Sequence, residues 1–156
     1  MHLNNDHRNL NQQLCFLFYV SSKEVIKSYT AHLKDYDLTY TGYITLSAFG
    51  DDEVLNIKQL GTRIYLNSGT LTPLIKKLVT KGLITKSRDD EDERNLKLSL
   101  TPAGKALKHK VQNISCYVGQ EMTIDKEDVD TLVNILDRFV RRNFPYRTTI
   151  SHDNQK

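Results

Sequence analysis

Apolar residues recur every three or four positions over long parts of the chain, with polar residues between them. This spacing is typical of helices that bury one face. It predicts long helices over residues 12–33, 101–121 and 125–140, each with an apolar stripe along one side. Both ends of the fold are therefore expected to consist of amphipathic helices.

Shorter helices in the middle of the chain are predicted from residues that cap helix ends. Thr39 is placed to cap a helix that ends at Gly50, where two aspartates follow. Asn56 and Gln59 have the spacing of a capping box, in which each side chain binds the backbone of the other residue. This box predicts a short helix over residues 57–64.

A turn over residues 65–67 separates this short helix from a longer one over residues 68–81, which Asn67 is placed to cap. Residues 83–86 and 96–100 then alternate apolar and polar side chains, and the run between them is wholly polar. Alternation on both sides of a polar run predicts a β-hairpin with a long tip.

This order of elements is that of a winged helix-turn-helix, in which two short helices joined by a turn precede a hairpin. We therefore predict a mainly α fold with a small β-hairpin wing, flanked by long helices at both ends of the chain.

The composition is that of one globular domain, with 156 residues of which 38% are hydrophobic and 26% charged. No apolar run approaches the roughly 18 residues that cross a bilayer. The amino end has neither the basic start nor the cleavage site of a secretory signal. We therefore expect a cytoplasmic protein that does not contact a membrane.

The charges are unevenly distributed along the chain. Residues 54–88 hold seven Lys or Arg and no Asp or Glu, so this stretch carries +7, whereas the net charge of the whole chain is +3 and the remainder must carry −4. A solvated face normally mixes both signs, so a long acid-free basic stretch favours nucleic acid as the partner.

The predicted helix over residues 68–81 has the composition of a recognition helix. Small and hydroxyl residues at its start can approach base edges in a major groove, and lysines further along, including Lys81, can reach phosphates. The alternative is a buried helix with one polar side. We expect DNA contacts from Lys58, Arg63, Ser68, Gly69, Thr70, Thr72, Lys76 and Lys77.

The polar run of the hairpin adds two arginines, Arg88 and Arg94. An arginine on a thin protruding loop fits a narrow minor groove, where the negative potential is enhanced. Five acidic residues separate the two arginines, and we expect at least one of these acids to orient an arginine by an ion pair.

Cys15 and Cys116 are isolated, without a CxxC motif or a Cys/His cluster. This excludes a zinc finger and a disulfide scaffold, and we expect no metal and no cofactor. A single cysteine on an apolar helix face is either a small hydrophobic residue or, where donors stabilise its thiolate, a reactive one. Tyr19 lies one helical turn after Cys15 and is within reach of its sulfur.

Four separated motifs resemble those of a known family. They are Gln13-Leu14-Cys15-Phe16, Leu38-Thr39-Tyr40, the run from Tyr65 to Leu74, and Asp92-Glu93-Arg94. Over about residues 10–143 the chain resembles the MarR family of winged-helix regulators. Within it the resemblance is to the organic-hydroperoxide-sensing OhrR branch and the staphylococcal SarZ-like thiol-based regulators.

The resemblance implies a homodimer that binds double-stranded DNA at a pseudo-palindromic operator, joined by its first and last helices. It divides the chain into a flexible amino end (1–9), one MarR-type domain (10–145) and a flexible tail (146–156). Within the domain we expect the winged helix-turn-helix at about 39–100 and the dimerisation helices at about 10–34 and 102–143.

The resemblance also implies that Cys15 is the oxidant-sensing thiol, with Tyr29 and Tyr40 as its hydrogen-bonding partners. Tyr29 lies 14 residues along the same helix, about 21 Å away at 1.5 Å per residue. Tyr29 can therefore reach this sulfur only from the other subunit, which predicts a sensor at the dimer interface.

The role of Cys116 has two readings. In some members of the family a second cysteine, late in the chain, converts the oxidised first cysteine to a disulfide, and the resemblance implies this for Cys116. The alternative is a buried cysteine that packs beside Ile114 and Val118.

We therefore expect a DNA-binding transcriptional regulator, not an enzyme, that an organic hydroperoxide or a similar oxidant releases from DNA through Cys15. One alternative is a regulator gated by a small aromatic ligand, with Cys15 structural. The other is a thiol peroxidase, which is disfavoured because none of the five histidines lies in a catalytic motif.

Overall fold

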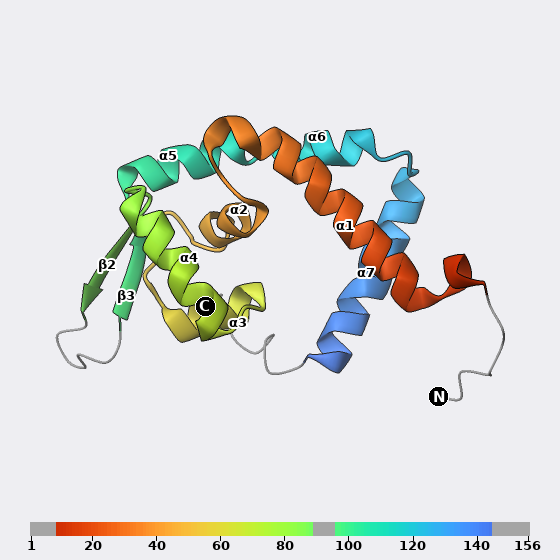
Figure 1. Cartoon of the computed structure of the whole chain (residues 1–156), viewed down its shortest axis with the longest axis horizontal. Helices are drawn as coiled ribbons and strands as arrows, with labels where there is room; N and C mark the ends of the chain where they lie inside the picture. Colours follow the sequence, from red (N-terminus) through yellow and green to blue (C-terminus); the bar gives the residue numbers. More distant parts are fainter. Residues whose placement is uncertain (1–8, 89–95, 145–156) are drawn as a thin grey trace.

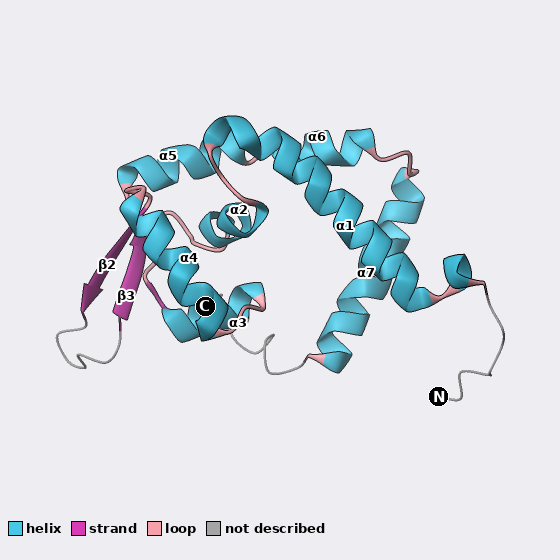
Figure 2. Cartoon of the chain, in the orientation of Figure 1, coloured by secondary structure: helices cyan, strands magenta, loops and turns pink. Residues whose placement is uncertain are grey.

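The chain folds into helices that surround one small antiparallel sheet, as the computed structural model shows for residues 9–88 and 96–144 (Figure 2). The helices are η1 (Leu10–Gln12), α1 (Leu14–Leu33), η2 (Lys34–Tyr36), α2 (Tyr40–Ser47), α3 (Ile57–Ile64), α4 (Ser68–Thr80), α5 (Pro102–Val111), α6 (Ile114–Glu121) and α7 (Lys126–Asn143). The strands are β1 (Leu55–Asn56), β2 (Ile84–Arg88) and β3 (Leu96–Leu100).

The predicted helix caps are present. The Thr39 hydroxyl accepts from the Gly42 N–H at 3.1 Å at the start of α2. The capping box of α3 is complete, because the N–H groups of Asn56 and Gln59 each donate to the other residue's side chain at 2.8 Å. These bonds satisfy N–H groups that a helix start leaves without intrahelical partners.

The sheet contains one strand that the sequence did not predict. β1 pairs antiparallel with β3, and β3 pairs with β2, which gives the order β1-β3-β2. β1 has two residues, too short for an alternating pattern to be visible. The predicted first hairpin strand, 83–86, is also shifted, because pairing continues through Ser87 and Arg88.

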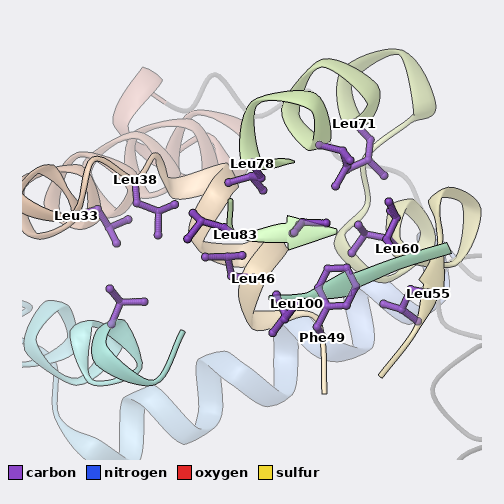
Figure 3. Close-up of a cluster of buried hydrophobic side chains, with 14 of the residues drawn as sticks. Leu33, Leu38, Leu46, Phe49, Leu55, Leu60, Leu71, Leu78, Leu83 and Leu100 are labelled. Atoms are coloured by element: carbon purple, nitrogen blue, oxygen red, sulfur yellow. The ribbon is translucent and has the colours of Figure 1, made fainter. Parts of the chain in front are cut away.

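Much of the hydrophobic core lies between α2, α3, α4 and the sheet (Figure 3), and the same core continues to Leu33 of α1, Val111 of α5 and Val118 of α6. Its largest fully buried side chains include Leu46, Phe49, Leu60, Leu71 and Leu98. α4 contributes the apolar side that its sequence predicted, since Leu71, Ile75 and Leu78 are all buried. This packing fixes α4 against the sheet and leaves its other side at the surface.

The prediction of one helix over residues 101–121 is wrong. The helix is interrupted at Gln112 and Asn113, and α5 packs against α2 whereas α6 packs against α1. Asn has a low propensity for helix interiors, and Asn113 adopts φ −82° and ψ −5°, within the right-handed helical region but away from the values of a regular α-helix. The bend lets Val111, Ile114 and Val118 all be buried, which indicates that packing on two different helices determines the break.

The turn between α3 and α4 requires glycine at position 61. A Cβ at Gly61 would lie 2.6 Å from the carbonyl oxygen of Leu66, too close for any side chain. Tyr65 adopts the left-handed conformation with φ 59° and ends α3. The predicted turn over residues 65–67 is therefore present and tightly specified.

α1 and α7 cross each other away from the winged-helix part, whereas the carboxyl end of α1 packs against α2 (Figure 1). α5 and α6 connect the two regions. The rings of Phe18 and Phe139 are 5.6 Å apart between these helices. α7 has no buried residue, although one of its sides is apolar. Exposed apolar residues of the two helices are Leu14, Leu17, Phe18, Ile26, Val129, Leu132, Val133, Ile135 and Phe139.

These nine exposed residues define the α1/α7 apolar face. An exposed apolar surface of this kind marks an interaction site in soluble proteins.

Some predictions fall outside the described residues, namely the flexible amino end predicted over 1–9 (except Asn9), the flexible tail predicted over 146–156, and the hairpin tip with Arg94. Within the described ranges, no helix is both long and apolar enough to span a membrane.

Candidate nucleic-acid interface

The exposed side of α4 presents the polar residues that the sequence placed there. Ser68, Gly69, Thr70 and Thr72 are exposed in its first turns. The Asn67 side chain accepts from the Thr70 N–H at 2.9 Å and caps the helix. Short side chains at an exposed helix start allow the backbone to approach a base edge or a phosphate closely.

Three lysines surround this polar surface. Lys58 of α3 and Lys76 and Lys77 of α4 are exposed, and none forms an ion pair with another described residue. No acidic residue occurs in α3, in α4 or in the turn between them. Unpaired ammonium groups on an acid-free surface are suited to contacts with phosphates.

Arg63, predicted to contact DNA, is half-buried and bound to other residues of the chain. Its guanidinium donates to both carboxylate oxygens of Glu53, at 2.7 and 2.9 Å, and to the carbonyl oxygen of Ala48 at 2.6 Å. The hydrogen bond from Arg63 keeps the pKa of the Glu53 carboxyl below its usual value, and the same bond raises the pKa of Arg63. Arg63 therefore joins α3 to the end of α2, and its charge is neutralised there.

Lys81 is also engaged within the chain, although its sequence position suggested a phosphate contact. Its ammonium donates to the Asp37 carboxylate at 2.6 Å and to the Asp37 carbonyl oxygen. The partners of Arg63 and Lys81 lie 10 and 44 residues away in sequence, which is why the charge pattern alone did not reveal them.

Arg88 belongs to β2, where its backbone pairs with Leu96, so it does not lie in the polar tip where the sequence placed it. Sequence reasoning gave no specific role to Lys86, which is exposed on β2. Lys86 and Lys76 both line a cavity of about 240 Å³ formed by α3, α4 and β2. Lys86 therefore extends the basic surface from α4 to β2, and its place in the acid-free stretch of the sequence was the available signal.

Cys15 lies in the first turn of α1, and its side chain is exposed. In the sequence, Cys15 is close to three residues of the α1/α7 apolar face, namely Leu14, Leu17 and Phe18. The expected partners Tyr29 and Tyr40 lie together elsewhere, with ring centroids 4.9 Å apart, and Tyr43 completes the cluster at 5.3 Å from Tyr29.

The tyrosine cluster is chemically suited to donate hydrogen bonds. Burial is the main reason that the pKa of Tyr29 is raised to about 12, with a smaller contribution from Tyr43. Burial likewise raises the pKa of Tyr40. A phenol with a raised pKa stays protonated and can donate to an anionic acceptor such as a thiolate.

Cys116 is exposed on α6, so the alternative of a buried cysteine is wrong. Ile114 and Val118 face the core, and the Cys116 sulfur accepts from the Gln120 amide at 3.7 Å. The next residue, Tyr117, stacks on His32 near the end of α1 with ring centroids 6.1 Å apart. Cys116 therefore lies beside the carboxyl end of α1, whereas Cys15 lies at its amino end.

No group of three or more His, Cys, Asp or Glu side chains in the described part of the chain is arranged to hold a metal ion. A groove of about 380 Å³ between α1 and α6 is lined by residues that include Ser21, Val25, Val118 and Met122.

Residues 27–111 match the family described as transcriptional regulator SarA/Rot. The HTH-type transcriptional regulator SarZ of Staphylococcus aureus strain USA300 is 56% identical over 137 residues, which cover 88% of this chain and 93% of that protein. SarZ of strain MRSA252 is 57% identical over 135 residues, covering 86% and 91% of the two chains.

Solved structures extend the comparison to the fold. Reduced AbfR bound to DNA matches with a TM-score of 0.70 and 25% identity over 85% of this chain and 93% of that one. The reduced form of MarR from E. coli matches with a TM-score of 0.71 and 21% identity, over 82% and 96% of the two chains. The winged-helix fold predicted from the sequence is confirmed by these likenesses and by the observed elements.

Proposed function

Because the chain belongs to the SarA/Rot family of transcriptional regulators, we propose that it acts as a homodimer which a hydroperoxide releases from DNA by oxidising Cys15. It is a DNA-binding transcriptional regulator of the MarR/SarA type. The dimer, the oxidant and the residues that contact DNA make up the proposal.

The exposed surface of α4 supports its role as the helix that reads DNA. Its buried side fixes its position, its first turns carry small and hydroxyl residues, and Lys58, Lys76 and Lys77 flank them with unpaired charges. Phosphate contacts from the lysines supply affinity, and contacts from Ser68 to Thr72 supply base recognition.

The salt dependence of binding distinguishes the lysines that contact phosphate from the arginine that does not. We expect Lys76→Ala to lower the slope of log affinity against log salt by about one per subunit, because one fewer counterion is displaced. Arg63→Met is expected to leave this slope unchanged and to lower the melting temperature, because Glu53 loses its partner. Fluorescence anisotropy at several salt concentrations and a thermal melt measure both effects. A lower slope in Arg63→Met together with an unchanged slope in Lys76→Ala would contradict this assignment.

The α1/α7 apolar face supports a homodimer. It contains nine exposed apolar residues and includes much of α7, a helix of 18 residues without a buried side chain. A helix packs stably in water only when its apolar side is covered. A second copy of the same face is self-complementary under twofold symmetry and also pairs two recognition helices.

The observation that carries the oxidant proposal is the exposure of Cys15 within this α1/α7 apolar face. A thiolate there attacks the distal oxygen of a hydroperoxide, the O–O bond breaks, and the alcohol leaves with a proton, so that Cys15 becomes a sulfenic acid. A polar group formed at a dimer interface changes the packing of two helices, and each carries a DNA-binding unit.

The solved relative AbfR lends support, because it is described in a reduced and an overoxidised form bound to DNA. Those descriptions concern AbfR; for this chain they favour a thiol that responds to oxidants.

Cys116 of the other subunit is proposed to resolve the sulfenic acid. Cys116 lies next to Tyr117, which stacks on His32, and His32 is 17 residues after Cys15. Cys15 and His32 are therefore about 25 Å apart along α1, which places Cys116 of the same chain far from Cys15, whereas a disulfide needs Cα atoms within about 7 Å. Cys116 thiolate from the second subunit attacks the sulfenyl sulfur, the S–S bond forms, and the oxygen leaves as water.

We expect one equivalent of hydroperoxide to yield a covalent dimer on a non-reducing gel, and dithiothreitol to reverse it. Cys15→Ser and Cys116→Ser are each expected to abolish this band, because each removes one of the two sulfurs. A covalent dimer that persists in Cys116→Ser would contradict the assignment, as would a sulfenic acid that remains unresolved in the unaltered protein.

One experiment separates the proposed function from its two alternatives. A DNA duplex selected by the protein from a random pool is bound to the reduced protein and treated with cumene hydroperoxide or with salicylate. The proposal predicts release by hydroperoxide alone, with peroxide consumption ending near one equivalent per Cys15. Release by salicylate alone would favour a ligand in the groove between α1 and α6, and sustained peroxide consumption with a dithiol would indicate a peroxidase.

A further inference from the structure

The carboxyl end of the recognition helix is tied to the segment that follows α1. Lys81 ends α4, and its ammonium donates to both the carboxylate and the carbonyl oxygen of Asp37. Asp37 lies directly after η2 in the left-handed conformation, with φ 49° and ψ 42°. One lysine therefore joins two elements separated by 44 residues of sequence.

The two partners differ in exposure. The Lys81 side chain is 23% exposed, whereas that of Asp37 is 92% exposed. The hydrogen bond from Lys81 holds the pKa of the Asp37 carboxyl below its usual value, and the nearby charge of Lys77 adds to this effect. Lys81 is thus held close to the fold, with its charge neutralised within the chain.

The same end of α4 is also bound to the residue that follows β3. Gly82 follows with φ 69°, and the Thr101 hydroxyl donates to the Gly82 carbonyl oxygen at 2.6 Å. The amino end of α4 is fixed by the Asn67 cap and by the close approach at Gly61. α4 is therefore held at both ends. Of these contacts, the one with Asp37 connects α4 to the segment that follows α1.

We propose that Asp37 is a positioning residue for α4, whose ion pair with Lys81 sets the orientation of the recognition helix and thereby its DNA sequence specificity. Base contacts depend on orientation because each hydrogen bond has a narrow angular range, whereas a flexible lysine reaches a phosphate from many orientations. Loss of the ion pair reduces binding to a preferred sequence more than binding to arbitrary DNA.

The test compares affinities for two DNA duplexes in the full-length protein, by fluorescence anisotropy. One duplex is selected from a random pool by the unaltered protein, and the other is a scrambled duplex of the same composition. Asp37→Asn removes the charge but keeps a residue type that tolerates the left-handed conformation. Lys81→Met removes both hydrogen bonds but keeps an unbranched apolar stem. Asp35→Asn is the matched control, because it removes an equal charge from the same segment.

We expect Asp37→Asn and Lys81→Met each to lower the ratio of selected to scrambled affinity by about threefold to tenfold. The double variant is expected to be no worse than the poorer single variant, because both changes remove one contact. Lys81→Arg is expected to retain most of the ratio, since an arginine can still pair with Asp37.

Charge alone gives a different result. Asp37→Asn removes a negative charge and Lys81→Met removes a positive one. A purely electrostatic effect would therefore raise the affinity of Asp37→Asn for both duplexes and lower that of Lys81→Met for both. The ratio of selected to scrambled affinity would be unchanged in each variant. That result would overturn the proposal, as would an equal loss of ratio in Asp35→Asn. Melting temperatures measured in parallel identify any variant that has lost its fold. The affinity ratios of the folded variants then test the proposal.

Discussion

Replacement of Leu132 and Val133 by aspartate is expected to give a monomer that binds its selected DNA duplex at least about a hundredfold more weakly. Both side chains are exposed on the α1/α7 apolar face, at 47% and 58%. Two carboxylates buried against a second apolar face would be desolvated without partners. A monomer presents one recognition helix, and it loses the gain of about 10² to 10⁴ that comes from linking two binding units.

The matched control is Thr131→Asp combined with Asn134→Asp, which adds the same charge to the same helix. At 100° per residue, Asn134 lies on the opposite side of α7 from the apolar stripe, and Thr131 lies beyond the edge of the stripe. Sedimentation at micromolar concentration and anisotropy are both measured. A dimeric Leu132→Asp/Val133→Asp variant that keeps full DNA affinity would show that the subunits do not meet at this face.

The second large effect is expected for Cys15→Ser, which should bind DNA as the reduced protein does but lose its response to hydroperoxide. Serine is close to cysteine in size, so the packing of α1 is retained. Its hydroxyl is not ionised at neutral pH and does not attack a peroxide bond. The unaltered protein is expected to lose at least about tenfold in affinity on oxidation, and the variant less than about twofold.

Cys116→Ser provides the control for this variant, because it also removes one exposed thiol. It is expected to keep the initial response to oxidant while losing the disulfide. If Cys15→Ser is still released by hydroperoxide, another group must sense the oxidant, and the assignment of Cys15 fails.

Local sequence signals predicted the winged helix well because its helices begin at residues that bind their own backbone. Thr39, Asn56 and Asn67 each cap the helix that the sequence assigned to them. The apolar side of α4 was also predicted, because its buried residues recur at helical spacing. Such features depend on neighbours within a few residues, so they are visible in the sequence.

The features that the sequence missed all depend on distant partners. β1 exists because Leu55 pairs with Leu98, and the break between α5 and α6 exists because each packs on a different helix. Arg63 and Lys81 have the composition of phosphate contacts, yet Glu53 and Asp37 neutralise them. The sequence does not show which basic residues in and next to α3 and α4 are available to DNA. The structure shows it, because it reveals which of them form ion pairs within the chain.

The most direct measurement of the central claim is a titration of the bound complex with hydroperoxide. The reduced protein is saturated with its selected duplex, and cumene hydroperoxide is added in small increments while anisotropy reports the DNA that remains bound. The account predicts release that is complete by about one equivalent per Cys15 and is reversed by dithiothreitol. Binding that persists beyond several equivalents, while alkylation shows Cys15 to be oxidised, would contradict it.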